Sequence, residues 1–162
     1  MLRLIHNITV KVFEKNPDNI QKCLSVFHQL LPIDFEKEKI KIKHEKAEGF
    51  FQKIIHILTV KTGKNRHNTL LMKTVLDHLS IVDRKRLIHE LPSRIDEEGF
   101  FYIRLDKESL LQDHFEITET GDCFHMKIKL AAFPSNPEAF MNTATTLLSQ
   151  YGKENPDRNK NS

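Results

Sequence analysis

The sequence predicts a single α+β domain, with one mixed or antiparallel sheet and helices packed mainly on one face of it. Segments whose apolar residues alternate are interspersed with segments whose apolar residues recur every three or four positions. The 162 residues show no internal repeat and no dividing linker, and 39% of them are hydrophobic and 29% charged. We expect the domain to span residues 1–151. A disordered polar tail is expected over 152–162, where no apolar side chain occurs.

The first half of the chain predicts three strands and one helix. A strand is expected over 4–13, where His6, Ile8 and the following apolar residues alternate with polar ones. A helix with apolar residues at three- and four-residue spacing begins at Pro17 and ends before Pro32. Alternation returns over 39–44 and over 54–61, and Gly49 marks the turn between these strands. The second of them is richer in apolar residues, which favours a more central place in the sheet.

The second half predicts three helices and up to three strands. Asn65 or Asn68 is expected to cap a helix whose apolar positions run to Leu79, and a short helix over 84–91 is expected to end at Pro92. Alternation over 100–105 indicates a strand. The segments 115–118 and 124–130 read as a hairpin that turns at 120–122, and the last helix is expected over 137–151.

Several functional classes leave no signature in the sequence. No window approaches the roughly 20 apolar residues of a membrane helix, and Arg3 interrupts the start of the chain, so we expect no membrane partner and a cytoplasmic location. Cys23 and Cys123 match no metal or redox spacing and are expected to be buried thiols. Neither zinc-type histidine spacing nor a glycine-rich phosphate loop occurs, so no metal and no cofactor are expected. Three histidines on predicted strands, His6, His44 and His56, are expected to be partly buried.

Charge is unevenly distributed along the chain. The net charge is +3, but residues 52–86 sum to +6 and residues 87–122 to −7. Such asymmetry is typical of a protein with one positive surface that meets phosphates. Equally, the two segments can neutralise one another after folding, and the sequence leaves both interpretations open.

Basic residues share faces of the predicted strands. They form three sets: Lys39, Lys41 and Lys43; Lys127 and Lys129 with His125; and Arg104 with Tyr102. A denser cluster, Lys61, Lys64, Arg66 and His67, stands at the entry to a helix, whose N-terminus attracts anions. These residues favour contacts to a nucleic-acid backbone. The alternative is that outward lysines keep the sheet soluble and protect its edges.

The acidic segment offers a competing interpretation. A nuclease holds Mg²⁺ through carboxylates and substrate phosphate, and four carboxylates suit that chemistry: Asp96, Glu97, Asp106 and Glu108. Their spacing has no specific signature. A metal-dependent nuclease is therefore the weakest of the alternatives, and no catalytic residue is expected.

Segments in the same order along the chain resemble an archaeal family, the predicted exosome-subunit RNA-binding proteins. They are Ile5-His6-Asn7-Ile8, Leu30-Leu31-Pro32, Glu36-Lys37-Glu38, the run 45–51, the run 103–107 and the run 127–134. The resemblance implies an α+β fold similar to the ribosomal protein that binds 5S ribosomal RNA, and RNA binding linked to exosomal decay or ribosome biogenesis. Members of the family often continue Glu-Gly-Phe with Gly-Asn-Pro, whereas Gln52-Lys53 stands there in this chain.

Together these observations predict a non-enzymatic RNA-binding protein. Backbone contacts are assigned to eight basic residues: Lys11, Lys61, Lys64, Arg66, Arg104, Lys107, Lys127 and Lys129. Tyr102 is assigned as a residue that stacks on a base. The alternative is a protein–protein interaction module with little RNA affinity, which joins an exosome- or ribosome-related assembly through its acidic segment. Whether the sheet pairs across a homodimer stays open.

Overall fold

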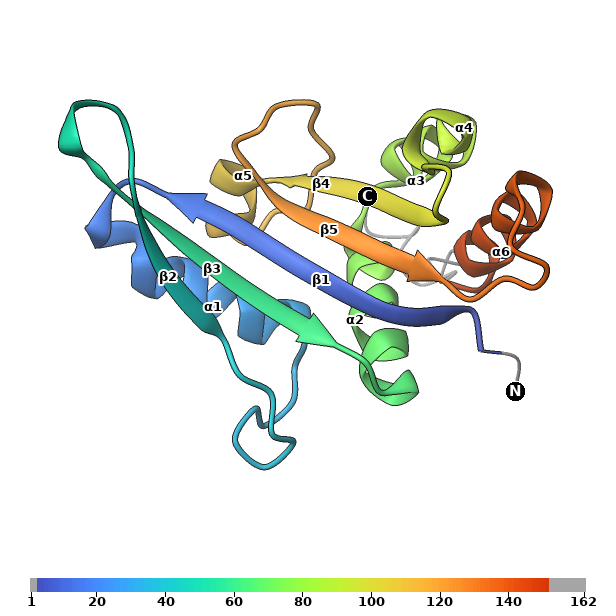
Figure 1. Cartoon of the computed structure of the whole chain (residues 1–162), viewed down its shortest axis with the longest axis horizontal. Helices are drawn as coiled ribbons and strands as arrows, with labels where there is room; N and C mark the ends of the chain where they lie inside the picture. The colour runs from blue at the N-terminus through green and yellow to red at the C-terminus, as the bar shows by residue number, and fades with distance from the viewer. Residues whose placement is uncertain (1–2, 152–162) are drawn as a thin grey trace, which may run out of the picture.

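A computed structural model describes residues 3–151 and confirms the α+β class. Its sheet has five antiparallel strands in the order β2-β3-β1-β5-β4. Their bounds are β1 Ile5–Glu14, β2 Lys43–Glu48, β3 Ile54–Thr62, β4 Phe100–Asp106 and β5 Cys123–Leu130. The helices lie behind the sheet or beyond its end as seen in Figure 1, so the face toward the viewer is open. The predicted tail at 152–162 lies outside the described residues.

Six α-helices cover the other face and the margins of the sheet in the described part of the chain. Their bounds are α1 Ile20–Leu30, α2 Asn65–His78, α3 Ile81–His89, α4 Leu91–Arg94, α5 Lys107–Leu111 and α6 Pro137–Gln150. There are also two 3₁₀ turns. The first, η1 Pro17–Asn19, precedes α1, and the second, η2 Phe50–Gln52, closes the β2–β3 hairpin. Within residues 3–151 no helix is long and apolar enough to cross a membrane.

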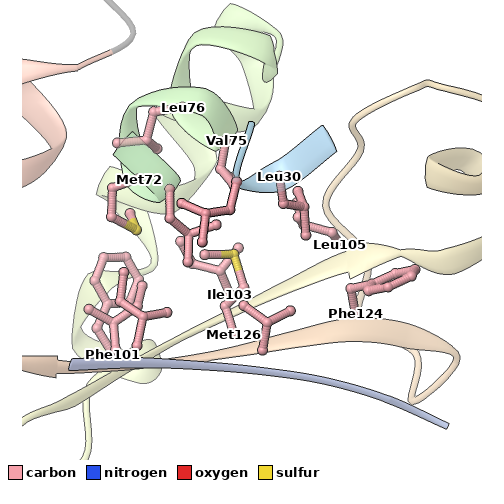
Figure 2. Close-up of a cluster of buried hydrophobic side chains, with 14 of the residues drawn as sticks. Leu30, Met72, Val75, Leu76, Phe101, Ile103, Leu105, Phe124 and Met126 are labelled. Carbon is pink, nitrogen blue, oxygen red and sulfur yellow. The ribbon is translucent and has the colours of Figure 1, made fainter. Parts of the chain in front are cut away.

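The core lies between the sheet and the helices behind it. Alternate residues of β4, Phe101, Ile103 and Leu105, are fully buried, and Met72 and Val75 of α2 are equally enclosed. Figure 2 shows these side chains converging with Phe124 and Met126 of β5. Because strand residues alternate between faces, burial of this set directs the intervening residues to the open face.

Gly99 holds α6 close to the start of β4. Its φ of +85° lies in the left-handed region, and a Cβ atom there would lie 2.5 Å from Cε1 of Phe140 on α6. Glycine is therefore required for both its backbone conformation and its lack of a side chain.

The second strand begins later than predicted. The segment 39–44 does not form a strand at its start: Lys39 adopts φ 59°, and the N–H of Ile40 donates to the carbonyl of Phe35 at 2.8 Å. Phe35 is buried and anchors this loop, while Ile40 and Ile42 pack against the core from it. All six residues of β2 are exposed, so strand pairing with β3 rather than burial sets its position.

Three other local predictions are wrong. Residues 115–118 form no hairpin with β5 and pair with β4 instead, through a single bridge between Leu105 and Ile117. The short helix α5, which lies between β4 and this segment, is absent from the sequence prediction. Pro92 does not end a helix but lies in the first turn of α4, where its missing N–H costs nothing. Neither Asn65 nor Asn68 caps α2; Lys64 occupies the cap position without a side-chain bond.

Two strand histidines are more exposed than predicted. A register shift between Ile5 and Asn7 displaces His6 from the apolar face, and His6 is exposed. His44 is exposed as well, and its Nε2 lies 2.8 Å from Nδ1 of the half-buried His56. Both predicted buried thiols, Cys23 and Cys123, are buried and free.

Candidate nucleic-acid interface

Strand pairing gathers most of the predicted site residues on the open face. Residues directly opposite each other in an antiparallel pair share a face. One row across the sheet contains Lys61, Thr9, Lys127 and Tyr102. The adjacent row contains Lys43, Thr59, Lys11, His125 and Arg104. A third, shorter row contains Asn7, Lys129 and Phe100.

Positive charge dominates these outward positions. Six of them carry a cation: Lys11, Lys43, Lys61, Arg104, Lys127 and Lys129. The outward carboxylates of the strands, Glu45 and Asp106, lie toward the ends of the face, and Glu45 pairs with Lys43 at 3.5 Å. Adjacent same-face residues of one strand are about 6.7 Å apart, so the rows form a regular positive lattice.

Aromatic rings accompany the cations on β4. The Nζ atoms of Lys127 and Lys129 lie 4.2 and 4.6 Å from the centre of the Phe100 ring, within cation–π distance. The Tyr102 hydroxyl donates to Asp96 at 2.8 Å. Burial and this hydrogen bond raise the pKa of Tyr102 to about 12, so the phenol stays neutral and only its ring is available for stacking.

His125 is the titratable group at the centre of the positive rows. Burial first, and then the positive charges of Arg104, Lys127 and Lys11, lower the pKa of His125. The imidazole is therefore neutral at physiological pH. A bound phosphate would reverse this charge environment and favour the protonated ring.

A groove rich in lysine extends the face past β3. It has a volume of about 660 Å³ and lies between β3, the loop before β2 and the start of α2. Five lysines from these segments and from the first residue of β2 line it: Lys39, Lys41, Lys43, Lys61 and Lys64. Its lining carboxylate, Glu38, already contacts Arg66 and His67 of α2. The groove thus keeps an excess of positive charge beside a helix N-terminus.

Lys64 and Arg66 differ in how they face this groove. Lys64 is exposed at the cap position of α2 and lines the groove. The Arg66 guanidinium is bound by Glu38, and 64% of its side chain remains exposed. Arg66 is therefore placed beside the groove with one carboxylate partner already in place.

Lys107 lies apart from the face, which revises its assignment to RNA contacts. Its ammonium group is buried and contacts Glu14 Oε2 at 2.9 Å, Asp122 Oδ1 at 2.8 Å and the Phe13 carbonyl at 3.1 Å. These contacts use all three of its donors. Burial lowers the pKa of Lys107, but Asp122 and Glu14 outweigh this effect and raise it overall. Lys107 thus neutralises a buried carboxylate and joins β1 to α5.

Two of the four carboxylates of the nuclease interpretation, Asp96 and Asp106, serve local structure. Asp96 accepts from the N–H groups of Glu98 and Phe100 and from Tyr102. Asp106 accepts from the N–H and the hydroxyl of Ser109 as the N-cap of α5. Among residues 3–151, no group of three or more metal-binding side chains is placed to hold an ion.

The residues assigned to RNA contacts from the sequence leave out part of this surface. Lys39 and Lys41 come from a loop, so their association with Lys61 depends on folding rather than on strand period. Phe100 meets two lysines only through the β4–β5 register, which the sequence does not display. The signal available in the sequence was the clustering of lysine itself.

The structure thus defines a class, an α+β domain whose antiparallel sheet presents one basic face with aromatic rings. A family model described as RNA binding matches residues 7–130, and the chain belongs to this RNA-binding protein family. RNA-binding protein PAB1135 of Pyrococcus abyssi is 28% identical over 143 residues, which cover 88% of this chain and 93% of that protein.

Solved structures share the fold over nearly their whole length. Mth689, a DUF54 protein from Methanothermobacter thermautotrophicus, is 26% identical with a TM-score of 0.72, covering 90% of this chain and 98% of that one. AF2318 from Archaeglobus fulgidus is 24% identical with a TM-score of 0.76, covering 88% and 99%. These relatives come from archaea, in agreement with the resemblance described above.

Proposed function

We propose that this protein binds RNA through the open face of its sheet and the adjoining lysine groove, and that it does so without catalysing a reaction. The observation that carries the proposal is the register of Lys61, Lys127, Lys11 and Arg104 across neighbouring strands. Membership of an RNA-binding family supports RNA as the polyanion. Backbone phosphates would lie over the lysines, and the Tyr102 ring would contribute a surface for a base.

Fluorescence anisotropy with a labelled single strand and a labelled hairpin RNA tests this function. We expect micromolar or tighter binding that weakens linearly on a plot of the logarithm of affinity against the logarithm of salt concentration. DNA of the same sequence serves as the comparison, because contacts to the 2′-hydroxyl distinguish RNA from DNA. Absence of binding to any RNA at low salt would refute the proposal and favour a protein–protein interaction module.

We further propose that the RNA belongs to a decay or ribosome-related assembly, and that the protein acts in the cytoplasm. The family resemblance supports the setting, and the two free cysteines suit a reducing compartment. Affinity purification from cells with and without nuclease treatment tests it. Exosome or ribosomal proteins retained only when RNA is intact would indicate association through RNA; their absence in both cases would refute the association.

A further inference from the structure

The tip of the β2–β3 hairpin exposes aromatic side chains to water. Phe50 and Phe51 are 90% and 93% exposed, and Ile54 next to them is 52% exposed. Figure 1 shows the hairpin projecting past the start of α1, away from the core. Contiguous apolar surface of this kind is rare on a soluble domain and marks interaction sites.

The turn that carries these residues is strained. Phe51 (φ 61°, ψ 32°) and Gln52 (φ 60°) both adopt left-handed conformations, which L-residues other than glycine seldom occupy. Such conformations are strained, and backbone strain concentrates at functional sites. The N–H of Gly49 donates to the Lys53 carbonyl at 2.7 Å and closes the turn. The backbone therefore holds two phenylalanines outward instead of folding them onto the sheet.

The apolar tip continues the basic face along the strand direction. Phe13 follows Lys11 on the outward side of β1, pairs with Ile57 of β3 and is 50% exposed. One step further lies a hollow of about 640 Å³. Its lining combines Gly49, Phe50, Phe51 and Ile55 with the charged residues Lys15, Lys53 and Glu48. Since same-face residues are about 6.7 Å apart, the apolar surface begins one step beyond the lysine rows.

We propose that the hairpin tip stacks against unpaired bases of the RNA whose backbone crosses the basic face, so that the protein selects RNA with a loop or single-stranded end over a fully paired duplex. This inference rests on the proposed function. Bases in a continuous duplex are stacked on one another and are not available, whereas splayed bases stack on aromatic side chains. Lys15 and Lys53 beside the rings match the phosphates that flank such bases. These charges favour a nucleic acid over an apolar protein surface as the occupant.

The test compares the Phe50→Ala/Phe51→Ala variant with the wild type on a hairpin RNA with a large loop and on a blunt duplex of matched length. We expect the variant to lose about tenfold or more in affinity for the loop RNA and little for the duplex, because stacking contributes about 1–3 kcal/mol per base. The salt slope should not change, since no charge is removed. A 2-aminopurine base in the loop should change its fluorescence on binding to the wild type but not to the variant.

Phe133→Ala is the matched control, because Phe133 is a 98% exposed phenylalanine that follows β5 at the opposite end of the sheet. Its affinity for both RNAs should equal that of the wild type. If the Phe50/Phe51 variant kept the wild-type affinity for loop RNA and the wild-type 2-aminopurine response, the stacking proposal would be overturned. RNA binding by the basic face would not be affected by that result. A protein partner lost by this variant in a nuclease-treated pull-down, with RNA affinity unchanged, would overturn it in favour of a protein ligand. Failure of the wild type to bind either RNA would instead refute the proposed function.

Discussion

Replacement of Lys11, Lys61 and Lys127 by alanine should reduce the salt dependence of RNA binding by a calculable amount. These side chains lie in two adjacent rows at the centre of the open face. Their removal costs the cation–π contact of Lys127 with Phe100 but no ion pair within residues 3–151, so the melting temperature should fall only slightly. The variant therefore separates the loss of phosphate contacts from the loss of folding.

The magnitude follows from the number of cations. Of the nine cations of the face and groove, we expect six to contact phosphates: Lys11, Lys43, Lys61, Lys64, Arg104 and Lys127. With a slope of about −0.7 per phosphate on a single strand, six contacts give about −4, and a fourfold increase in salt lowers affinity about 300-fold. Three remaining contacts give about −2, and the same increase lowers affinity only about 20-fold.

Anisotropy titrations between about 50 and 200 mM salt measure both slopes. The control variant replaces Lys22, Lys73 and Lys85, exposed lysines on α1, α2 and α3, and removes the same charge from helices instead of the sheet, with the loss of one ion pair, Lys73 to Asp77. Its slope should equal that of the wild type. Equal slopes for all three proteins would refute the assignment of the open face, even if the wild type binds RNA.

Three further predictions concern single residues. RNA affinity should rise as pH falls below about 6.5, the ordinary pKa of histidine, because the pKa of His125 is lowered in the free protein and phosphate favours its protonated form; His125→Asn should reduce this rise in anisotropy titrations. Lys107→Met should lower the free energy of unfolding, measured in urea, by about 3–5 kcal/mol, because it leaves the buried Glu14 carboxylate without its cation. The folded fraction of this variant should bind RNA as the wild type does. Gly99→Ala should lower the melting temperature, because its methyl group meets the Phe140 ring; an unchanged melting temperature would contradict the packing described for α6.

The alternation of apolar and polar residues predicted the strands that have one buried face. It failed for the strand that has no buried face. β4 alternates fully buried residues such as Phe101 with outward ones, and its predicted bounds differ from the observed ones by a single residue. Every residue of β2 is exposed, so its pattern contains no core face. The apolar residues that suggested an earlier strand, Ile40 and Ile42, instead pack onto the core from a loop anchored by Phe35.

The candidate site was partly predictable because lysines on neighbouring strands can be recognised without knowing the strand order. Their alignment into rows could not be predicted, since it depends on the register between β1 and two strands distant in sequence. Lys107 illustrates the opposite case. Flanked by Asp106 and Glu108, it reads as a surface residue, and only the fold brings it to the buried Glu14.

The fold also explains how a chain with a small net charge presents a strongly positive face. Carboxylates of the acidic segment 87–122 bind groups of the same segment: Glu90 binds Arg94, Asp106 caps α5, and Asp122 binds Lys107. These carboxylates are therefore directed into local contacts instead of toward the lysines of β3 and β5. At the same time, the strand order places those two strands on either side of β1, which joins basic segments from the two halves of the chain. The charge asymmetry of the sequence thus becomes a spatial one, because the acidic residues stabilise the periphery while the outward lysines of the central strands remain available to an anion.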